Sequence, residues 1–192
     1  MIKIYFVRHL KTKGNYEKRY IGRTDESLYE AEKQTLLTSL KGVQTVYSSP
    51  MKRCIETARL LAPGKAPVIV EGLKEIDFGE FENKCYEELK DNPDYISFIA
   101  SNGTGSIPQG ENAIAFKNRC CNAFAEIIKS LKSSSNPVIL IVSHGGSIMS
   151  ILDRYEVQQK GFYNYQVKNG FGYEAEYNPE TNKITIIKEL IE

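Results

Sequence analysis

The sequence predicts an α/β fold, a three-layer α/β/α sandwich around a mainly parallel sheet. Short apolar segments alternate with amphipathic ones along the chain, which is typical of parallel strands joined by crossover helices. The run VILIV at residues 138–142 is wholly apolar, as expected of a central strand that helices cover on both faces. With 192 residues, the chain is long enough for one well-buried core, so we expect a single domain over residues 1–192.

Local patterns place the individual elements in order. Apolar runs rich in β-branched and aromatic residues predict strands, and three- and four-residue spacing of apolar side chains predicts helices. One helix is expected to begin at Pro50 with Ser49 as its cap. The expected strands are 2–7, 43–47, 68–70 and 138–142, with a terminal hairpin of 172–178 and 183–189. The expected helices are 27–41, 50–62, 85–91, 93–100 and 111–131, with one more after 138–142. Loops are expected at 11–26 and 101–110, and a turn at 133–137.

Composition excludes several classes of protein. The formal net charge is +1 at pH 7, so no overall charge favours nucleic acid or an anionic membrane. No stretch approaches the roughly 20 apolar residues of a membrane-spanning helix, and the apolar opening lacks the basic flank of a signal peptide. We expect a cytoplasmic protein, either a monomer or a homodimer. The four cysteines form no C-x-x-C pair and there are two histidines, so we expect neither a metal site nor another cofactor.

Both histidines lie where this fold class predicts an active site. His9 and His144 each follow a predicted apolar strand, and ligands of such sheets bind beyond the carboxyl ends of the strands. Arg8 precedes His9, and Arg53 lies in the first turn of a helix that follows another strand. Two arginines and two histidines at one edge form a site for a tetrahedral oxyanion, because a guanidinium donates paired hydrogen bonds and stays charged. The alternative is that the histidines are structural and the arginines are solvated.

Five short motifs occur in order over residues 5–146. They are RHLKTKGN at 8–15, YIGRTD at 20–25, SSPMKRCIETA at 48–58, LKEIDFGEFE at 73–82 and VSHGG at 142–146. Together they resemble the histidine phosphatase superfamily, which includes the cofactor-dependent phosphoglycerate mutases. One Arg-His pair is weak evidence, whereas five ordered matches are specific. Residues 18–25 also resemble the α-ribazole phosphatase branch of cobalamin biosynthesis, although this match is softer.

The resemblance implies a role for each matched residue. His9 attacks phosphorus and forms a phosphohistidine that water hydrolyses. Arg8, Arg53 and His144 hold the phosphoryl oxygens, since phosphoryl transfer needs mainly positioning and electrostatic stabilisation. Glu75 protonates the leaving alkoxide and later deprotonates the water. The substrate-binding residues implied by the same motifs are Thr12, Asn15 and Gly22.

The acid motif contains three carboxylates besides Glu75. Asp77, Glu80 and Glu82 lie near Glu75 in the sequence, and spacing alone does not identify the catalytic acid among the four. The register of the family motif selects Glu75.

Leu10 stands where the family usually has glycine, a residue that lets the backbone approach phosphate or adopt a positive φ. We therefore expect the leucine to push this loop outward and to lower activity.

The short interval between Glu75 and His144 favours net hydrolysis of a small-molecule phosphate monoester, because mutases of the family carry extra segments over the site. α-Ribazole 5'-phosphate is one candidate substrate, and a range of sugar phosphates is another. A lid is expected over residues 80–112, where aromatic and polar side chains either contact the leaving group or simply pack: Phe81, Tyr86, Tyr95, Phe98, Glu111 and Asn112. The alternatives are phosphoglycerate mutase-type transfer and a weakly active protein that binds phosphorylated ligands.

Overall fold

A mainly parallel sheet of six strands lies at the centre of the protein. The computed structural model describes residues 1–33, 40, 42–131 and 137–190. The strands are β1 (Ile2–Arg8), β2 (Thr45–Ser48), β3 (Val68–Ile69), β4 (Val138–Ser143), β5 (Gly172–Asn178) and β6 (Lys183–Leu190). Their order is β3-β2-β4-β1-β5-β6, with β1 to β4 parallel and β5 and β6 antiparallel at one edge. The predicted parallel sheet and terminal hairpin are both confirmed.

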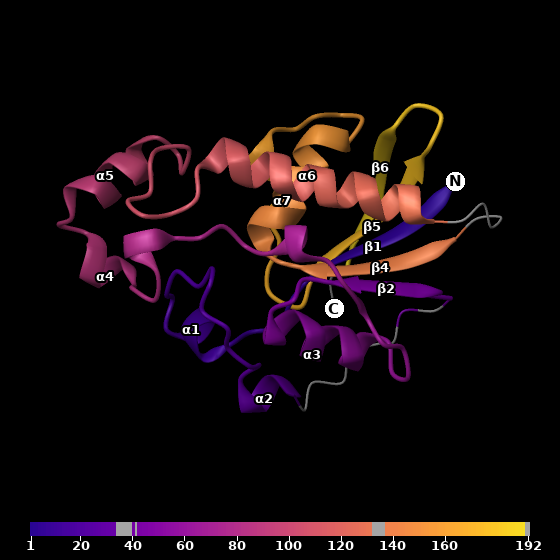
Figure 1. Cartoon of the computed structure of the whole chain (residues 1–192), viewed down its shortest axis with the longest axis horizontal. Coiled ribbons are helices and arrows are strands. Elements are labelled where there is room, and N and C mark those ends of the chain that lie inside the picture. The colour runs from indigo at the N-terminus through magenta and orange to yellow at the C-terminus, as the bar shows by residue number, and fades with distance from the viewer. Residues whose placement is uncertain (34–39, 41, 132–136, 191–192) are drawn as a thin grey trace.

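Helices cover both faces of this sheet, so the predicted three-layer sandwich is confirmed (Figure 1). The helices are α1 (Lys13–Tyr16), α2 (Glu30–Lys33), α3 (Lys52–Leu61), α4 (Tyr86–Leu89), α5 (Pro93–Ala100), α6 (Ala113–Ser130) and α7 (Gly145–Tyr155). Side chains alternate between the two faces of a strand. Ile139 and Ile141 of β4 therefore pack with α6 and α7, whereas Leu140 and Val142 pack with α3. All four side chains are fully buried, as the apolar run predicts.

The start of α3 differs from the prediction because a tertiary contact takes the predicted cap. The helix begins at Lys52, with Met51 as its N-cap, and not at Pro50. The hydroxyl of Ser49, the predicted cap, lies 2.8 Å from His144 Nε2. A capping hydrogen bond contributes only about 1 kcal/mol, so a buried imidazole can compete for the same hydroxyl.

Two more stretches depart from the sequence-based expectation. The predicted loop at 11–26 contains one helical turn, α1, because Thr12 and Asn15 form a capping box. The predicted helix at 27–41 is helical over Glu30–Lys33, but 34–39 and 41 lie outside the described residues, as does most of the predicted turn. The remaining elements agree with the prediction apart from small shifts at their ends. Within the described ranges, no helix is both long and apolar enough to cross a membrane.

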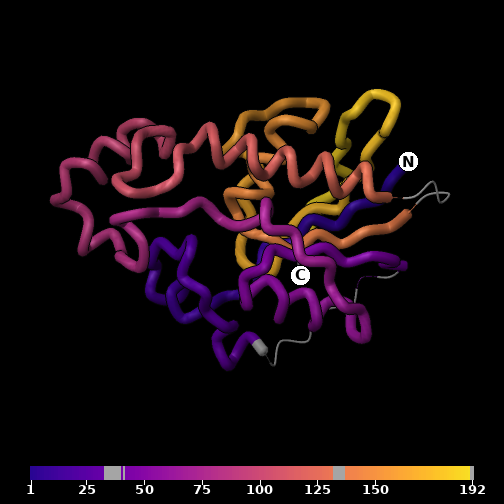
Figure 2. The backbone as a smooth tube through the Cα atoms, viewed as in Figure 1, coloured from indigo at the N-terminus to yellow at the C-terminus, as the bar shows by residue number. Residues whose placement is uncertain are grey.

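Between β3 and α6 the chain makes an excursion beyond the carboxyl ends of the parallel strands, toward the left of Figure 1. Figure 2 shows it leaving after β3, turning through α4 and α5, and returning as α6. The excursion has an aromatic interior, in which the ring of Phe81 lies 5.5 Å from Tyr95 and 5.7 Å from Phe98. The segment predicted as a lid is thus packed, and it lies beside the strand ends where ligands of such sheets bind.

Candidate active site

The two histidines and two arginines lie together at the carboxyl ends of β1 and β4. Arg8 ends β1 and is in register with Ser143 at the end of β4. His9 and His144 therefore emerge side by side, with ring centroids 5.2 Å apart and an angle of 67° between the rings. Arg53 reaches the same place from the first turn of α3, and its Nε donates to His144 Nδ1 over 3.4 Å. The four residues form one cluster, as their positions after parallel strands predict.

The His9 ring has one defined tautomer. Its Nδ1 lies 2.6 Å from the carbonyl oxygen of Leu10, and because a carbonyl only accepts hydrogen bonds, Nδ1 carries the proton. Burial, together with the charges of Arg53 and Arg8, holds the pKa of His9 well below its usual value. The ring is therefore neutral at pH 7. No described residue bonds to Nε2, so its lone pair is available to an electrophile in the cleft that His9 lines.

His144 is also neutral, but other side chains hold both of its nitrogens. Nδ1 accepts from Arg53 Nε, so Nε2 carries the proton and donates it to Ser49 Oγ over 2.8 Å. Burial and the charge of Arg53 hold the pKa of His144 well below its usual value. A direct contact between His144 and a phosphoryl oxygen therefore requires Nε2 to exchange its bond with Ser49. In the structure, the ring accepts a hydrogen bond from Arg53 and helps to fix the position of that side chain.

Arg8 and Arg53 are cations without an anionic partner at ion-pair distance among the described residues. Arg53 is fully buried, and it donates to the carbonyl oxygens of Thr24 and Gly22 over 2.7 and 2.9 Å. Arg8 donates from Nη1 to the carbonyl of Val167 over 2.8 Å, while its buried Nε has no partner in the described part of the chain. Charge removed from water without a counter-ion is costly, so the two guanidinium groups make this place suited to an anion.

Two residues predicted to bind substrate, Thr12 and Gly22, do not line the cleft beside His9. The carbonyl of Gly22 holds Arg53, and the buried Thr12 caps α1 beneath Asn15. Asn15 itself lines the cleft beside His9. Its Oδ1 accepts from the Thr12 N–H and from Asn169 Nδ2, which leaves its Nδ2 donor for a ligand.

Of the four acidic residues that spacing could not separate, Glu75 lines the cleft with His9. Its Oε2 accepts the N–H of Gly146 over 3.0 Å, and its Oε1 accepts that of Ile76 over 3.0 Å. Gly146 lies in the first turn of α7, where the helix dipole favours a carboxylate. The other three hold backbone or side-chain groups away from this cleft: Asp77 with Gly79, Glu80 with Gln109, and Glu82 with Gly22 and Thr24.

The cleft has a volume of about 970 Å³ and runs from His9 to the excursion. Most of its far wall is apolar and comes from the excursion, α6, α7 and the 3-10 turn η3 (Phe162–Tyr165): Phe78, Phe98, Ile99, Ile114, Met149, Phe162 and Tyr163. Of the predicted lid contacts, Phe98 lines the cleft. The other predicted lid residues do not line this cleft. Phe81 and Tyr95 are buried in the excursion, and Tyr86 is exposed. Glu111 pairs with Arg119, and Asn112 caps α6. The wall from η3 was missed because its aromatic residues carry no periodic or motif signal.

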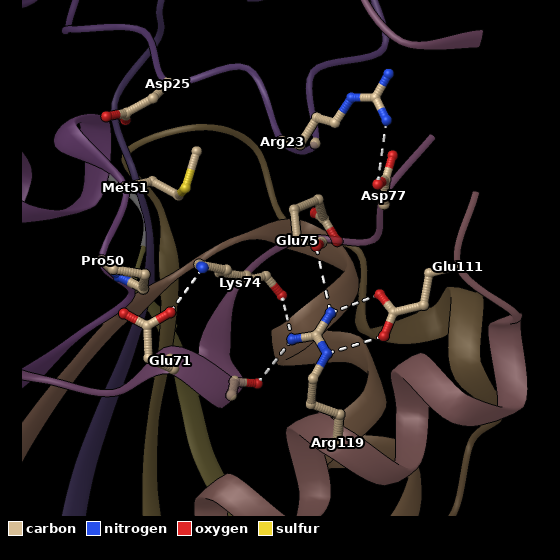
Figure 3. A pocket seen from close by; sticks show the side chains of 12 residues that line it. Arg23, Asp25, Pro50, Met51, Glu71, Lys74, Glu75, Asp77, Glu111 and Arg119 are labelled. Carbon is tan, nitrogen blue, oxygen red and sulfur yellow. Dashed lines mark hydrogen bonds and ion pairs between the residues drawn. The ribbon is translucent and has the colours of Figure 1, made fainter. Parts of the chain in front are cut away.

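A second cavity of about 660 Å³ adjoins the first at Glu75, which lines both. Figure 3 shows its wall, which is rich in charged side chains. These include Arg23, Asp77, Glu111 and Arg119. Glu75 thus lies between the cleft beside His9 and the charged cavity.

Leu10 is accommodated without the outward displacement that we expected. Its side chain is buried, its φ is not positive, and its N–H donates to Thr57 Oγ1 over 3.0 Å. The space it needs comes from Gly170, where a Cβ atom would lie 2.9 Å from Leu10 Cδ2. A glycine elsewhere in the fold therefore compensates for the leucine.

The structure is thus an α/β/α sandwich with two histidines and two arginines clustered at its strand ends. The sequence also matches the family model of the histidine phosphatase superfamily (branch 1) over residues 4–189, and the chain belongs to this superfamily. Relatives in the superfamily are named as phosphatases or mutases, so the chain is an enzyme of a phosphoryl-transfer superfamily.

Particular relatives are similar over most of the chain. Phosphoglycerate mutase-like protein 4 of Arabidopsis thaliana is 32% identical over 164 residues, which are 79% of this chain and 70% of that protein. The crystal structure of the α-ribazole phosphatase from Shigella flexneri matches with a TM-score of 0.82 at 24% identity, over 98% of this chain and 96% of that one. The crystal structure of a protein from Thermus thermophilus, TTHB049, matches with a TM-score of 0.73 at 25% identity, over 100% and 99%.

Proposed function

We propose that the protein hydrolyses a small-molecule phosphate monoester through a phosphohistidine formed on His9. One observation carries this proposal. A neutral histidine with an unoccupied Nε2 lies beside two arginines that have no counter-ion among the described residues. A phosphate ester supplies both the electrophile that such a nitrogen needs and the negative charge that the guanidinium groups need.

In the first step, the Nε2 lone pair of His9 attacks phosphorus. A P–N bond forms, and the bond between phosphorus and the ester oxygen breaks. Arg8 Nε and Asn15 Nδ2 donate to the phosphoryl oxygens, and Arg53, anchored by His144, adds a second positive charge. Protonated Glu75 transfers its proton to the leaving alkoxide, which departs as an alcohol.

In the second step, a water oxygen attacks phosphorus and the P–N bond breaks. Glu75, now a carboxylate, accepts a proton from this water, and His9 recovers its Nε2 lone pair. The net reaction consumes one ester and one water and releases one alcohol and one inorganic phosphate. Both side chains return to their starting states, and none of these steps requires a metal ion.

For the leaving group, we propose α-ribazole 5'-phosphate as the first substrate to test. Three observations support it: the likeness of residues 18–25 to that branch, the name of the Shigella flexneri neighbour, and the size and aromatic walls of the cleft. The Arabidopsis relative's name favours the second candidate, a mutase. Phosphate transfer from labelled phosphoglycerate without release of inorganic phosphate would support the mutase.

The test is release of inorganic phosphate from p-nitrophenyl phosphate and from a panel of esters that includes α-ribazole 5'-phosphate, all in excess EDTA. We expect turnover, and transient labelling of His9 when the ester carries ³²P. Full activity of His9→Ala, or loss of turnover on chelation, contradicts the mechanism. Tight binding of inorganic phosphate with no turnover of any ester supports the phospho-ligand-binding alternative.

A further inference from the structure

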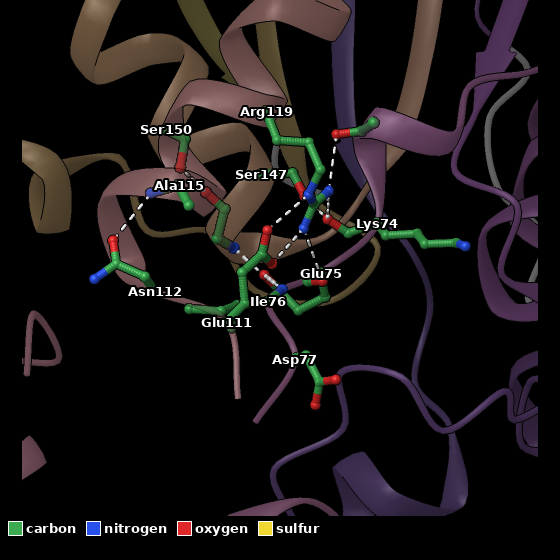
Figure 4. A network of polar contacts seen from close by, with 12 residues as sticks. Lys74, Glu75, Ile76, Asp77, Glu111, Asn112, Ala115, Arg119, Ser147 and Ser150 are labelled. Atoms are coloured by element: carbon green, nitrogen blue, oxygen red, sulfur yellow. Dashed lines mark hydrogen bonds and ion pairs between the residues drawn. The ribbon is translucent and has the colours of Figure 1, made fainter. Parts of the chain in front are cut away.

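The segment that carries Glu75 is held by side chains from other elements. It follows the 3-10 turn η1 (Glu71–Leu73), and residues 74 and 75 belong to no helix or strand. Arg119 of α6 donates to the carbonyls of Gly72, Lys74 and Glu75 over 3.0, 3.1 and 3.4 Å. The intervening carbonyl, of Leu73, accepts from two serine hydroxyls, those of Ser143 and Ser147. Four consecutive carbonyls are thus bound. Figure 4 shows Lys74 and Glu75 of this segment beside Arg119.

Glu111 holds the guanidinium of Arg119 in the orientation that reaches these carbonyls. Its carboxylate accepts two parallel hydrogen bonds, from Nε over 2.9 Å and from Nη2 over 2.6 Å, the geometry that gives arginine–carboxylate pairs their directional strength. The guanidinium also lies 5.2 Å from the ring centre of Phe116. Because its hydrogen-bonding edges and one face are engaged, the group has little freedom to rotate away.

Neither member of this pair contacts the space where the reaction is proposed. Glu111 and Arg119 line the charged cavity beyond Glu75 and do not line the cleft beside His9. Figure 3 shows the pair next to Glu75. An effect of this pair on the reaction must therefore pass through the Glu75 segment.

We infer that Glu111 and Arg119 are positioning residues, which fix the backbone of residues 72–75 so that the Glu75 carboxyl group meets the leaving-group oxygen. The inference rests on the proposed function, in which Glu75 is the proton donor. Misplacing a catalytic group by about 1 Å costs on the order of 100-fold in rate. In the first step, a leaving group that departs without a proton does not need this group, whereas a poor leaving group does.

The experiment compares Glu111→Gln and Arg119→Lys with the unchanged chain on two probes, β-glycerophosphate and p-nitrophenyl phosphate. We expect kcat/KM for β-glycerophosphate, which reports the steps through phosphoenzyme formation, to fall about 10- to 100-fold, and kcat/KM for p-nitrophenyl phosphate to fall less than about 3-fold. The matched control is Glu126→Gln, which removes a carboxylate from α6, the helix of Arg119, where it forms an exposed pair with Lys129. This variant should behave as the unchanged chain on both probes.

Glu75→Gln provides the second comparison. In that background, Glu111→Gln should cause no further loss on β-glycerophosphate, because the group it positions no longer donates a proton. Equal losses on both probes, or the same loss with and without Glu75, would show an ordinary structural ion pair and overturn the inference. If Glu75→Gln alone lowers kcat/KM for both probes equally, the acid role in the proposed function fails, and the inference fails with it for that separate reason.

Discussion

Gly146 and Glu75 lie so close together that a methyl group on Gly146 would overlap Glu75 Oε1. The same contact brings the Gly146 N–H within 3.0 Å of Oε2. A glycine at this place in the first turn of α7 therefore lets a carboxylate reach the end of the helix, where the dipole favours it. The second glycine of the VSHGG motif is thus explained sterically, because a side chain there would overlap the glutamate of the acid motif.

Gly146→Ala should displace the Glu75 carboxylate without unfolding the protein. The atoms that a methyl group would meet belong to the side chains of Glu75 and Phe116 and not to backbone, so they can move, and alanine favours the helix. We expect kcat/KM for β-glycerophosphate to fall about 10-fold or more, with kcat/KM for p-nitrophenyl phosphate nearly unaffected. Steady-state kinetics and a thermal melt measure both. A variant that melts far below the unchanged chain would contradict this account.

The two buried histidines should make stability depend on pH. Their pKa values are held well below the usual value of about 6.5 by burial and by the neighbouring arginines. As pH falls below about 6.5, the unfolded chain binds protons that the folded chain does not, so stability present above that pH is lost. The loss approaches about 1.4 kcal/mol per pH unit for each histidine.

Urea unfolding at pH 7 and at pH 5.5 measures this dependence. Replacing His9 by Asn should reduce the difference between the two curves, because one of the two groups no longer titrates in the unfolded chain. The substitution Lys129→Gln, on an exposed side chain, is the control and should leave the difference unchanged. An unfolding free energy that rises as the pH falls from 7 to 5.5 would contradict the prediction.

Glu82 acts at a distance from the cleft, through Arg53. Its Oε1 accepts the N–H groups of Gly22 and Thr24, each over 2.9 Å, and the carbonyls of these same two residues hold the Arg53 guanidinium. Its Oε2 is buried without a partner among the described residues. The carboxylate therefore stabilises the conformation of residues 22–24 in which two of their carbonyls accept hydrogen bonds from Arg53.

Glu82→Ala should release this loop and raise the inhibition constant of inorganic phosphate about 10-fold, because Arg53 loses its fixed orientation. Glu82→Gln keeps an oxygen acceptor for both N–H groups and should bind phosphate nearly as well as the unchanged chain. The two variants also test whether Glu75 or Glu82 is the proton donor. If Glu82→Gln abolished turnover of β-glycerophosphate while leaving phosphate binding intact, Glu82 would replace Glu75 as the proton donor.

The sequence predicts those parts of the site that follow from strand register and motif spacing. His9 and His144 could be placed together because each follows a parallel strand, and the ends of adjacent parallel strands meet. Arg119 could not be found, since its role depends on carbonyls 44 to 47 residues away along the chain. The predicted cap of α3 was wrong for a similar reason, because local sequence preferences contain no information about a distant imidazole that binds Ser49.

Leu10 and Gly170 form a complementary pair that explains how this chain accepts leucine at a family glycine position. The N–H of Gly170 donates to the carbonyls of Arg8 and His9, so the glycine holds the backbone of the nucleophile. Its φ of +81° favours glycine, and a Cβ atom there would lie 2.9 Å from Leu10 Cδ2. Gly170→Ala should therefore cost stability twice, through backbone strain of about 1 kcal/mol or more and through overlap with the leucine.

A double-mutant cycle separates the two costs. Leu10→Ala alone should destabilise by about 2 to 4 kcal/mol, because it removes a buried side chain. In that background, Gly170→Ala should cost only the backbone strain, so the two losses add to more than the loss in the double variant. Urea unfolding of the four proteins measures the coupling. Strict additivity would mean that the leucine and the glycine are independent, and that something other than Gly170 makes room for Leu10 beside His9.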